Sequence, residues 1–254
     1  TGTEAILMAS ERIQNGLADR MLAGSCSDSG PYVWGGFDAM RVVPSGYNQQ
    51  PERASRPMAE SAAGFVPSSG AGALVLESLQ SALKRKAHIH AEVLGGAVNC
   101  GGQRGGGSMT ASNGNAVQRC ITEALRTTGL KGDDIDIING HLTATSRDAE
   151  EVFNWSQSLG RSGADFPFIN SFKDVLGHGL SASGSMECVA ALLQFEARQV
   201  IGNRNTADLH PEISQLIDPS RVPVENIPAS PQIIAKASLG FGDVNACIIF
   251  KRYD

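Results

Sequence analysis

The sequence has no apolar run near the roughly 20 residues that a membrane-spanning helix requires, and no basic segment followed by an apolar core at its amino end. It also lacks an excess of positive charge, because 21 basic side chains stand against 26 acidic ones for a formal net charge of -5. These absences argue against a membrane span, a secretory signal and a general nucleic-acid-binding surface. We therefore expect a cytoplasmic protein.

Cysteine is scarce as well. The cysteines are odd in number, widely spaced, and form neither a CxxC pair nor a Cys/His metal pattern. We expect them to be reduced thiols, as in cytoplasmic proteins, and we expect no metal site. They are Cys26, Cys100, Cys120, Cys188 and Cys247.

Apolar residues make up 41% of the 254 positions, which is enough for a substantial core. Short apolar segments alternate with segments of helical periodicity, a pattern that predicts an α/β fold with a mainly parallel sheet covered by helices. Residues 25–60 form a long polar excursion, of a kind that often walls a site. A helix begins at the first residue, so we expect the native polypeptide to extend upstream. Expected strands cover 18–24, 73–77, 90–98, 135–140, 166–171, 233–239 and 246–252. Expected helices include 1–16, 78–87, 149–159, 181–200 and a segment with Val117, Ile121 and Leu125 on one face.

Functional groups of open α/β sheets collect beyond the carboxyl ends of strands, and two such junctions carry histidine. His141 follows the strand 135–140 and precedes Thr143 and Thr145. Lys173 lies five residues before His178, where small residues open a long helix whose amino end could stabilise negative charge. Taken singly, the first could be a loop histidine and the second a tightly packed glycine turn.

A third junction is a Gly-Phe-Gly turn after the strand 233–239, formed by Gly240, Phe241 and Gly242 and followed by Asn245. By itself it could be an ordinary hairpin. In this order and at these distances, the three junctions resemble the β-ketoacyl-acyl-carrier-protein synthases of the thiolase-like superfamily. Supporting segments are ASRP at 54–57, GFV at 64–66, GAGALVLE at 70–77, and Glu187 on the helix after His178.

The resemblance covers essentially the whole chain and implies a layered α-β-α-β-α fold that here lacks the first strands of its amino-terminal half. Residues 1–80 would be the remainder of that half, and residues 81–254 would be the carboxy-terminal half carrying both histidines. It also places the family's nucleophilic cysteine about two residues upstream of Thr1. Cys26 follows a strand but lacks the family's motif, so we do not expect it to replace that cysteine.

The activity that the resemblance implies is decarboxylating condensation of an acyl thioester with malonyl-acyl carrier protein. His141 and His178 would donate N–H bonds to the malonyl thioester oxygen. Lys173 would discourage protonation of these imidazoles, with Glu187 as its ionic counterpart. The backbone N–H of Phe241 would help form the oxyanion hole, and its ring would gate the acyl pocket.

Further implied roles concern the substrate and the partners. Thr143 and Thr145 would bind the phosphopantetheine arm, which arrives on the carrier protein, so no resident cofactor is expected. Gly240, Gly242 and Asn245 would support the turn that carries Phe241. The implied partners are acyl carrier protein, a second synthase subunit in a homodimer or heterodimer, and the upstream segment with the cysteine.

Several positions depart from the family's pattern. Leu142 replaces the usual glycine after the first histidine, Leu239 replaces an aromatic residue, and Asp243 and Val244 stand where Gly-Thr is common. Ala59 and Ala63 replace acidic residues near GFV, and Ser69 replaces a glutamate. These changes leave the length and shape of the acyl substrate open.

Two alternative functions stay open at this point. The first is a non-catalytic partner subunit of the chain-length-factor type, although such a partner has no need of two imidazoles and an ammonium at one site. The second is a hydrolase subunit with Thr1 as an amino-terminal nucleophile. That reading requires a free amine at Thr1 near the histidines.

Overall fold

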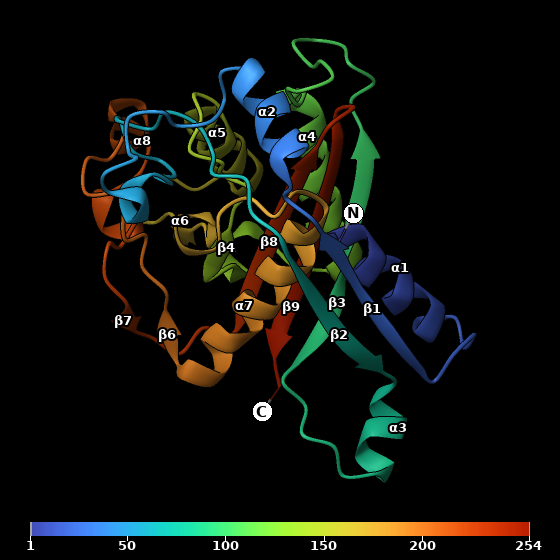
Figure 1. The fold of residues 1–254 in the computed structure, drawn as a ribbon. Helices are drawn as coiled ribbons and strands as arrows, with labels where there is room; N and C mark the ends of the chain where they lie inside the picture. Colours follow the sequence, from blue (N-terminus) through green and yellow to red (C-terminus); the bar gives the residue numbers. More distant parts are fainter. Residues whose placement is uncertain (1, 254) are drawn as a thin grey trace.

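The computed structural model describes residues 2–253, and its centre is a five-stranded sheet in the order β3-β9-β8-β4-β5 (Figure 1). The pairs β8-β4 and β4-β5 are parallel, whereas β3-β9 and β9-β8 are antiparallel. The expectation of a mainly parallel sheet is therefore wrong. The cause is the turn after β8, which is too short for a crossover and returns the chain directly as β9. The strands are β3 (Ala91–Cys100), β4 (Ile137–Asn139), β5 (Phe168–Asn170), β8 (Ile233–Gly240) and β9 (Val244–Arg252).

Helices α4 and α5 cover one face of this sheet. In α4, the Asn113 side chain accepts from two backbone N–H groups of the first turn, and Gly129 ends the helix with a φ of 72°. Val117 and Ile121 lie on the buried side of α4, as their spacing predicts, and pack in one cluster with Trp155 of α5. The helices are α4 (Gly114–Thr128) and α5 (Asp148–Leu159).

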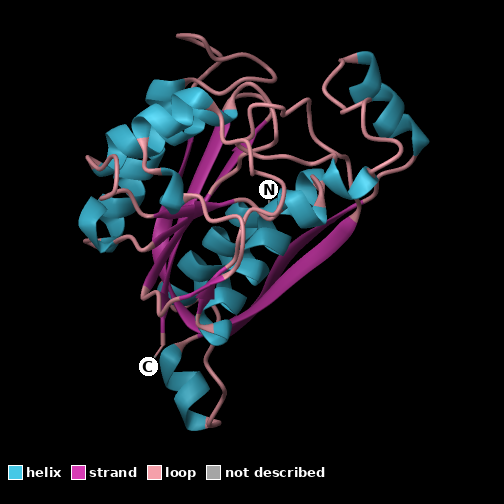
Figure 2. Ribbon diagram, turned by 90° about the vertical axis from the view of Figure 1, so that its left-hand side faces the viewer, coloured by secondary structure: helices cyan, strands magenta, loops and turns pink. Residues whose placement is uncertain are grey.

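Helices α1 and α7 cover the other face of the sheet, and a two-stranded antiparallel sheet, β1-β2, lies beyond them (Figure 2). Ile6 of α1, Cys188 of α7 and Phe250 of β9 share the second buried cluster. A Cβ at Gly72 in β2 would lie 2.6 Å from the backbone nitrogen of Met186 in α7, so glycine permits the close approach of strand and helix. These elements are α1 (Gly2–Gln14), α7 (Ser183–Ala197), β1 (Arg20–Ser27) and β2 (Gly70–Glu77).

The described residues thus form successive α, β, α and β layers, which confirms the predicted α/β class and layered order. The outer face of the β1-β2 sheet exposes Leu22 and Val75, at 74% and 67%. No helix among residues 2–253 is long and apolar enough to cross a bilayer. Thr1, the nucleophile of the hydrolase hypothesis, lies outside the described residues.

The long excursion after β1 is more ordered than the sequence indicates, because residues 31–39 form a helix. Pro31 occupies its first turn, where a missing N–H costs nothing. None of its side chains is buried, which explains why no apolar periodicity revealed it. The remaining short elements are α2 (Pro31–Ala39), α3 (Leu79–Lys84), α6 (Lys173–Leu176), α8 (Pro211–Leu216), β6 (Gln199–Val200), β7 (Ile227–Pro228) and the 3-10 turns Pro51–Arg53, Gly132–Asp134, Leu180–Ala182 and Pro219–Arg221.

Candidate active site

His141 follows β4 on a loop whose backbone is held by a carboxylate of α5. The Glu151 carboxylate accepts from the backbone N–H of His141 at 2.6 Å and of Leu142 at 2.7 Å. Lys173 donates from Nζ to the carbonyl oxygen of His141 at 2.6 Å. Burial raises the pKa of the Glu151 carboxyl, and the two N–H bonds oppose that shift. The position of the His141 ring thus depends on two buried ionisable side chains.

The same loop continues through both threonines. Asp148, at the start of α5, accepts from the backbone N–H of Thr143 at 2.9 Å and of Ala144 at 3.0 Å. The hydroxyl oxygens of Thr143 and Thr145 lie 3.1 Å apart. Leu142 and Ala144 have positive φ values of 22° and 61°, in a region that favours glycine. Leu142, an expected departure from the family's pattern, therefore stands at a position where the backbone is strained.

His178 lies beside the segment that resembles the GFV motif. Its backbone N–H donates to the Val66 carbonyl at 2.7 Å, and the Phe65 ring meets its imidazole edge-on at 4.9 Å between centroids. The backbone N–H of Leu180 donates to Nδ1 of His178 at 3.1 Å, and the Ser183 hydroxyl lies 3.0 Å from the same nitrogen. Because Nδ1 accepts, the proton of the neutral imidazole is assigned to Nε2.

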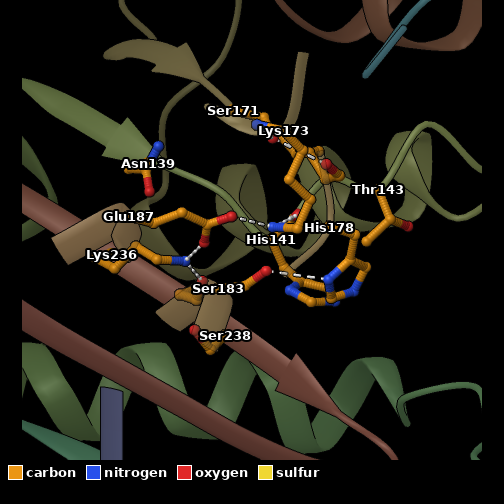
Figure 3. Close-up of polar contacts among 12 residues, drawn as sticks. Asn139, His141, Thr143, Ser171, Lys173, His178, Ser183, Glu187, Lys236 and Ser238 are labelled. Atoms are coloured by element: carbon orange, nitrogen blue, oxygen red, sulfur yellow. Dashed lines mark hydrogen bonds and ion pairs between the residues drawn. The ribbon is translucent and has the colours of Figure 1, made fainter. Parts of the chain in front are cut away.

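The fold brings the two histidines together, although 37 positions separate them in the sequence. Their ring centroids are 5.3 Å apart, and the ring planes are nearly perpendicular (Figure 3). Burial, followed by the charge of Lys173, lowers the pKa of His141 well below its usual value. Burial, and then the charge of Lys173, also lower the pKa of His178, to about 3. Both rings are therefore neutral at physiological pH. Nδ1 of His141 is buried without a hydrogen-bond partner among the described residues.

Behind the rings lies a buried ionic cluster of Lys173, Glu187 and Lys236, all at most 2% exposed (Figure 3). Glu187 forms ion pairs with Lys173 and, at 2.7 Å, with Lys236. Burial alone would raise the pKa of Glu187, but the two ammonium groups outweigh it and lower that pKa. Two cations against one anion leave a net positive charge that disfavours imidazolium nearby. Ammonium groups also repel a metal ion, so this part of the site does not suit metal binding.

Sequence reasoning missed several residues that position the site. Lys236 lies within the apolar strand pattern of β8, and Asp148 and Glu151 lie in the first turn of α5, where acidic residues are common in any helix. The expected ion pair between Lys173 and Glu187 is present. The sequence did offer one signal for Lys236, because a lysine within an apolar strand would be buried and would then require a partner of opposite charge.

The Gly-Phe-Gly turn joins β8 to β9 as a hairpin, with Gly240 paired to Val244. The Phe241 side chain is 57% exposed and lies two aromatic rings away from His178. Its ring centroid is 6.2 Å from that of Phe37 in α2, which is 4.9 Å from Phe65. An aromatic path thus connects the exposed turn with the histidine pair.

The base of this turn is held by buried polar groups. Asn245 donates to the Asn99 side chain at 3.1 Å. The fully buried Asp243 carboxylate accepts from the backbone N–H of Gln103 at 3.0 Å and of Asn113 at 2.7 Å, and Gly242 N–H donates to the Met109 carbonyl. Hydrogen bonds to Asp243 therefore hold the Gly-rich segment 101–112 against the turn that carries Phe241. Asp243 is one of the expected departures from the family's pattern.

The three buried cysteines do not lie in the arrangement of an activated nucleophile. Burial raises the pKa of Cys120 and of Cys188 to about 12, and that of Cys247 well above its usual value. Cys26 and Cys100 are exposed and free. A thiol with a raised pKa carries almost no thiolate, the reactive form.

These layers and the paired histidines define an α/β protein of the thiolase-like class. Two family models match: "Beta-ketoacyl synthase, N-terminal domain" over residues 1–82 and "Beta-ketoacyl synthase, C-terminal domain" over residues 90–207. The chain belongs to the beta-ketoacyl synthase family.

Known relatives match the chain over its whole length. It is 34% identical to 3-oxoacyl-[acyl-carrier-protein] synthase I, chloroplastic, of Arabidopsis thaliana, over 100% of this chain and 52% of the relative. A beta-ketoacyl synthase from Burkholderia phymatum superposes with a TM-score of 0.90 at 28% identity, over 100% of this chain and 59% of the other. The chain also superposes on a structure described as AntDE:AntF, a type II PKS acyl-carrier protein in complex with its ketosynthase bound to the hexaketide. The TM-score is 0.88 at 29% identity, over 100% of this chain and 61% of the other. The chain thus spans about half to three fifths of these proteins.

The neutral state of His178 can be observed directly by NMR. With its pKa lowered to about 3, the Cε1–H signal of His178 should keep the neutral-imidazole chemical shift from pH 8 down to about pH 5. Free imidazole in the same tube provides the titrating control. The signal is assigned from the spectrum of the His178→Ala variant, from which it disappears. A His178 midpoint near pH 6.5 would contradict the expected effect of burial and Lys173.

Proposed function

We propose that the protein containing this chain condenses an acyl thioester with malonyl-acyl carrier protein by decarboxylation, giving a β-ketoacyl-acyl carrier protein. The observation that carries this proposal is the pair of neutral imidazoles, one with its proton assigned to Nε2, beside a buried cationic cluster. Neutral N–H donors stabilise negative charge that develops on an oxygen without giving up a proton.

The reaction balances on this geometry. The carbon–carbon bond to the malonyl carboxylate breaks, carbon dioxide leaves, and the electron pair forms an enolate on the thioester oxygen, where His141 and His178 donate N–H bonds. The enolate carbon then attacks the acyl thioester carbon, and a thiolate leaves. We propose that the thiolate belongs to a cysteine outside these 254 residues, since the three buried thiols here have raised pKa values.

The other predicted residues take supporting roles in this proposal. Lys173, with Glu187 and Lys236, keeps the imidazoles neutral and holds the His141 backbone. Thr143 and Thr145 bind the phosphopantetheine arm, and their hydroxyls lie on the loop that carries His141. The backbone N–H of Phe241 completes the oxyanion hole and its ring gates the acyl path, which the aromatic contacts through Phe37 support. Gly240, Gly242 and Asn245 shape its turn.

We also propose the partners and the division of the chain. Acyl carrier protein is the proposed carrier of the malonyl group, in a homodimer or synthase heterodimer, and the similarity to a ketosynthase in complex with such a carrier supports it. Residues 1–80 and 81–254 are proposed to belong to the two thiolase-like halves, in keeping with the family matches at 1–82 and 90–207.

The proposal is tested by measuring carbon dioxide release from carboxyl-labelled malonyl-acyl carrier protein with the complete protein. Labelled carbon dioxide should appear in proportion to enzyme. A non-catalytic partner of the chain-length-factor type would release none by itself. The absence of release from protein that is folded and bears a cysteine upstream of Thr1 would overturn the condensation proposal in favour of that alternative.

A further inference from the structure

A second cluster of ionisable groups lies on the surface, at the end of α7 remote from the histidine pair. It consists of His88, His90 and Glu196, and one possible ligand atom of each lies within 4.8 Å of the others. His178 contacts Ser183 at the start of α7, whereas Glu196 is in its last turn. Fifteen helical residues span roughly 20 Å, so this cluster is separate from the proposed active site.

The two histidines are presented by an extended segment between α3 and β3. Residues 87–90 are neither helix nor strand, and exposed His88 and His90 flank the partly buried Ile89. In an extended chain, side chains two positions apart point to the same side, so Ile89 faces the protein while both imidazoles face outward. The spacing His-x-His thus places two nitrogen ligands next to one another.

Both imidazoles approach one oxygen of the same carboxylate. His88 Nε2 lies 3.2 Å from Glu196 Oε1, and His90 Nδ1 contacts the same oxygen more closely. The two rings are nearly perpendicular with centroids 4.6 Å apart, so they are not stacked. Zinc bonds of about 2.1 Å in a tetrahedron require ligand atoms about 3.4 Å apart. The separation of His88 Nε2 and Glu196 Oε1 is close to this value, and His90 would move slightly away from the carboxylate to admit the ion.

The charge environment also favours a cation. Glu196 is near the carboxyl end of α7, where the helix dipole disfavours an anion and favours a positive charge. The ion pairs that Glu196 forms among the described residues are with these two histidines. No lysine or arginine among residues 2–253 forms an ion pair with this carboxylate.

We propose that His88, His90 and Glu196 form a surface binding site for a transition-metal dication of the Zn²⁺ type. Two imidazoles and one carboxylate are a ligand set that Zn²⁺ uses, and water would complete the tetrahedron. The ion would join the segment before β3 to the end of α7. Glu196 is 106 positions from His90, so no local sequence motif reveals this site, and the expectation of no metal came from motifs alone.

The test is calorimetric titration of the complete protein, first treated with chelator, with ZnCl₂ alone. One Zn²⁺ should bind per chain, and Glu196→Gln and His88→Ala should each bind at least about tenfold more weakly. The matched control is Glu123→Gln, which removes an exposed glutamate paired with Arg126 on α4 and should leave zinc affinity unchanged. Zinc should also raise the melting temperature of the native protein and of the control more than that of the two variants.

Binding of Co²⁺ provides a second readout, because tetrahedral coordination by imidazole and carboxylate produces visible absorption bands. The bands should appear with the native protein and be absent from the His88→Ala/His90→Ala variant. Zinc affinity that is equal in the native protein and in every variant would overturn the proposal, as would the absence of saturable binding. Neither result would affect the condensation proposal, provided that decarboxylation is also measured in chelator-treated protein.

Discussion

Replacing His178 with alanine is expected to slow malonyl decarboxylation by about 10²–10³-fold, the loss typical of removing one oxyanion donor. The physical reason is the assigned proton on Nε2, which provides the N–H for the enolate oxygen because Nδ1 already accepts from Leu180. The measurement is the initial rate of carbon dioxide release at saturating malonyl-acyl carrier protein. Acylation of the cysteine proposed upstream should continue, because His178 is assigned to the malonyl half of the reaction.

Two further variants separate catalysis from structure. His178→Gln keeps an N–H donor near the same position and should lose less activity than alanine does. His210→Ala is the matched control, because that ring caps α8 by accepting from the Glu212 N–H and belongs to neither the histidine pair nor the ionic cluster. Decarboxylation by His178→Ala at the native rate, in a variant that folds normally, would remove this residue from the mechanism.

Replacing Glu187 with glutamine should lower the free energy of unfolding by about 3–5 kcal/mol, because it leaves two buried ammonium groups without their shared anion. Lys173 and Lys236 are at most 1% exposed and cannot regain water without disrupting the core. The quantity is measured by urea denaturation at pH 7. Glu123→Gln on α4, where the broken ion pair is exposed, should leave the unfolding curve unchanged.

A triple variant keeps this prediction testable even if Glu187→Gln does not fold. Combining Glu187→Leu with Lys173→Met and Lys236→Met removes every charge of the cluster at similar volume, and should restore most of the lost stability. It should not restore decarboxylation, since the ammonium that holds the His141 carbonyl would be gone. A Glu187→Gln protein as stable as the native one would show that the three groups are not ionised together.

The residues that sequence reasoning found share one property: each stands at a strand end or in a short motif of fixed spacing. His141, Lys173, His178 and Phe241 satisfy this condition, and the structure places the first three together. Lys236, Asp148 and Glu151 do not satisfy it, because their partners lie 49 or more positions away or are backbone N–H groups of a loop. A backbone N–H is the same at nearly every residue type, so these hydrogen bonds require no particular partner residue in the sequence.

The elements show the same division. Helix α4 was predictable because its apolar stripe faces a core. Helix α2 was not, because it buries no side chain and depends on its Pro31 start. The prediction of a mainly parallel sheet failed at the connection after β8. Alternation of strands and helices predicts parallel strands, but β8 and β9 are joined by a short turn and are therefore antiparallel.

By itself, the sequence determined the α/β class and the positions of the two histidines, since periodicity, turn residues and motif spacing are local properties of the chain. The layered order was implied by the resemblance to the synthase family. Only the tertiary structure decided that the imidazoles are neutral. Burial and the charges of Lys173 and Lys236 act through space, and they depend on which strands and helices pack against one another. The same holds for the surface cluster, where α7 brings a carboxylate to two histidines that precede it by more than 100 positions.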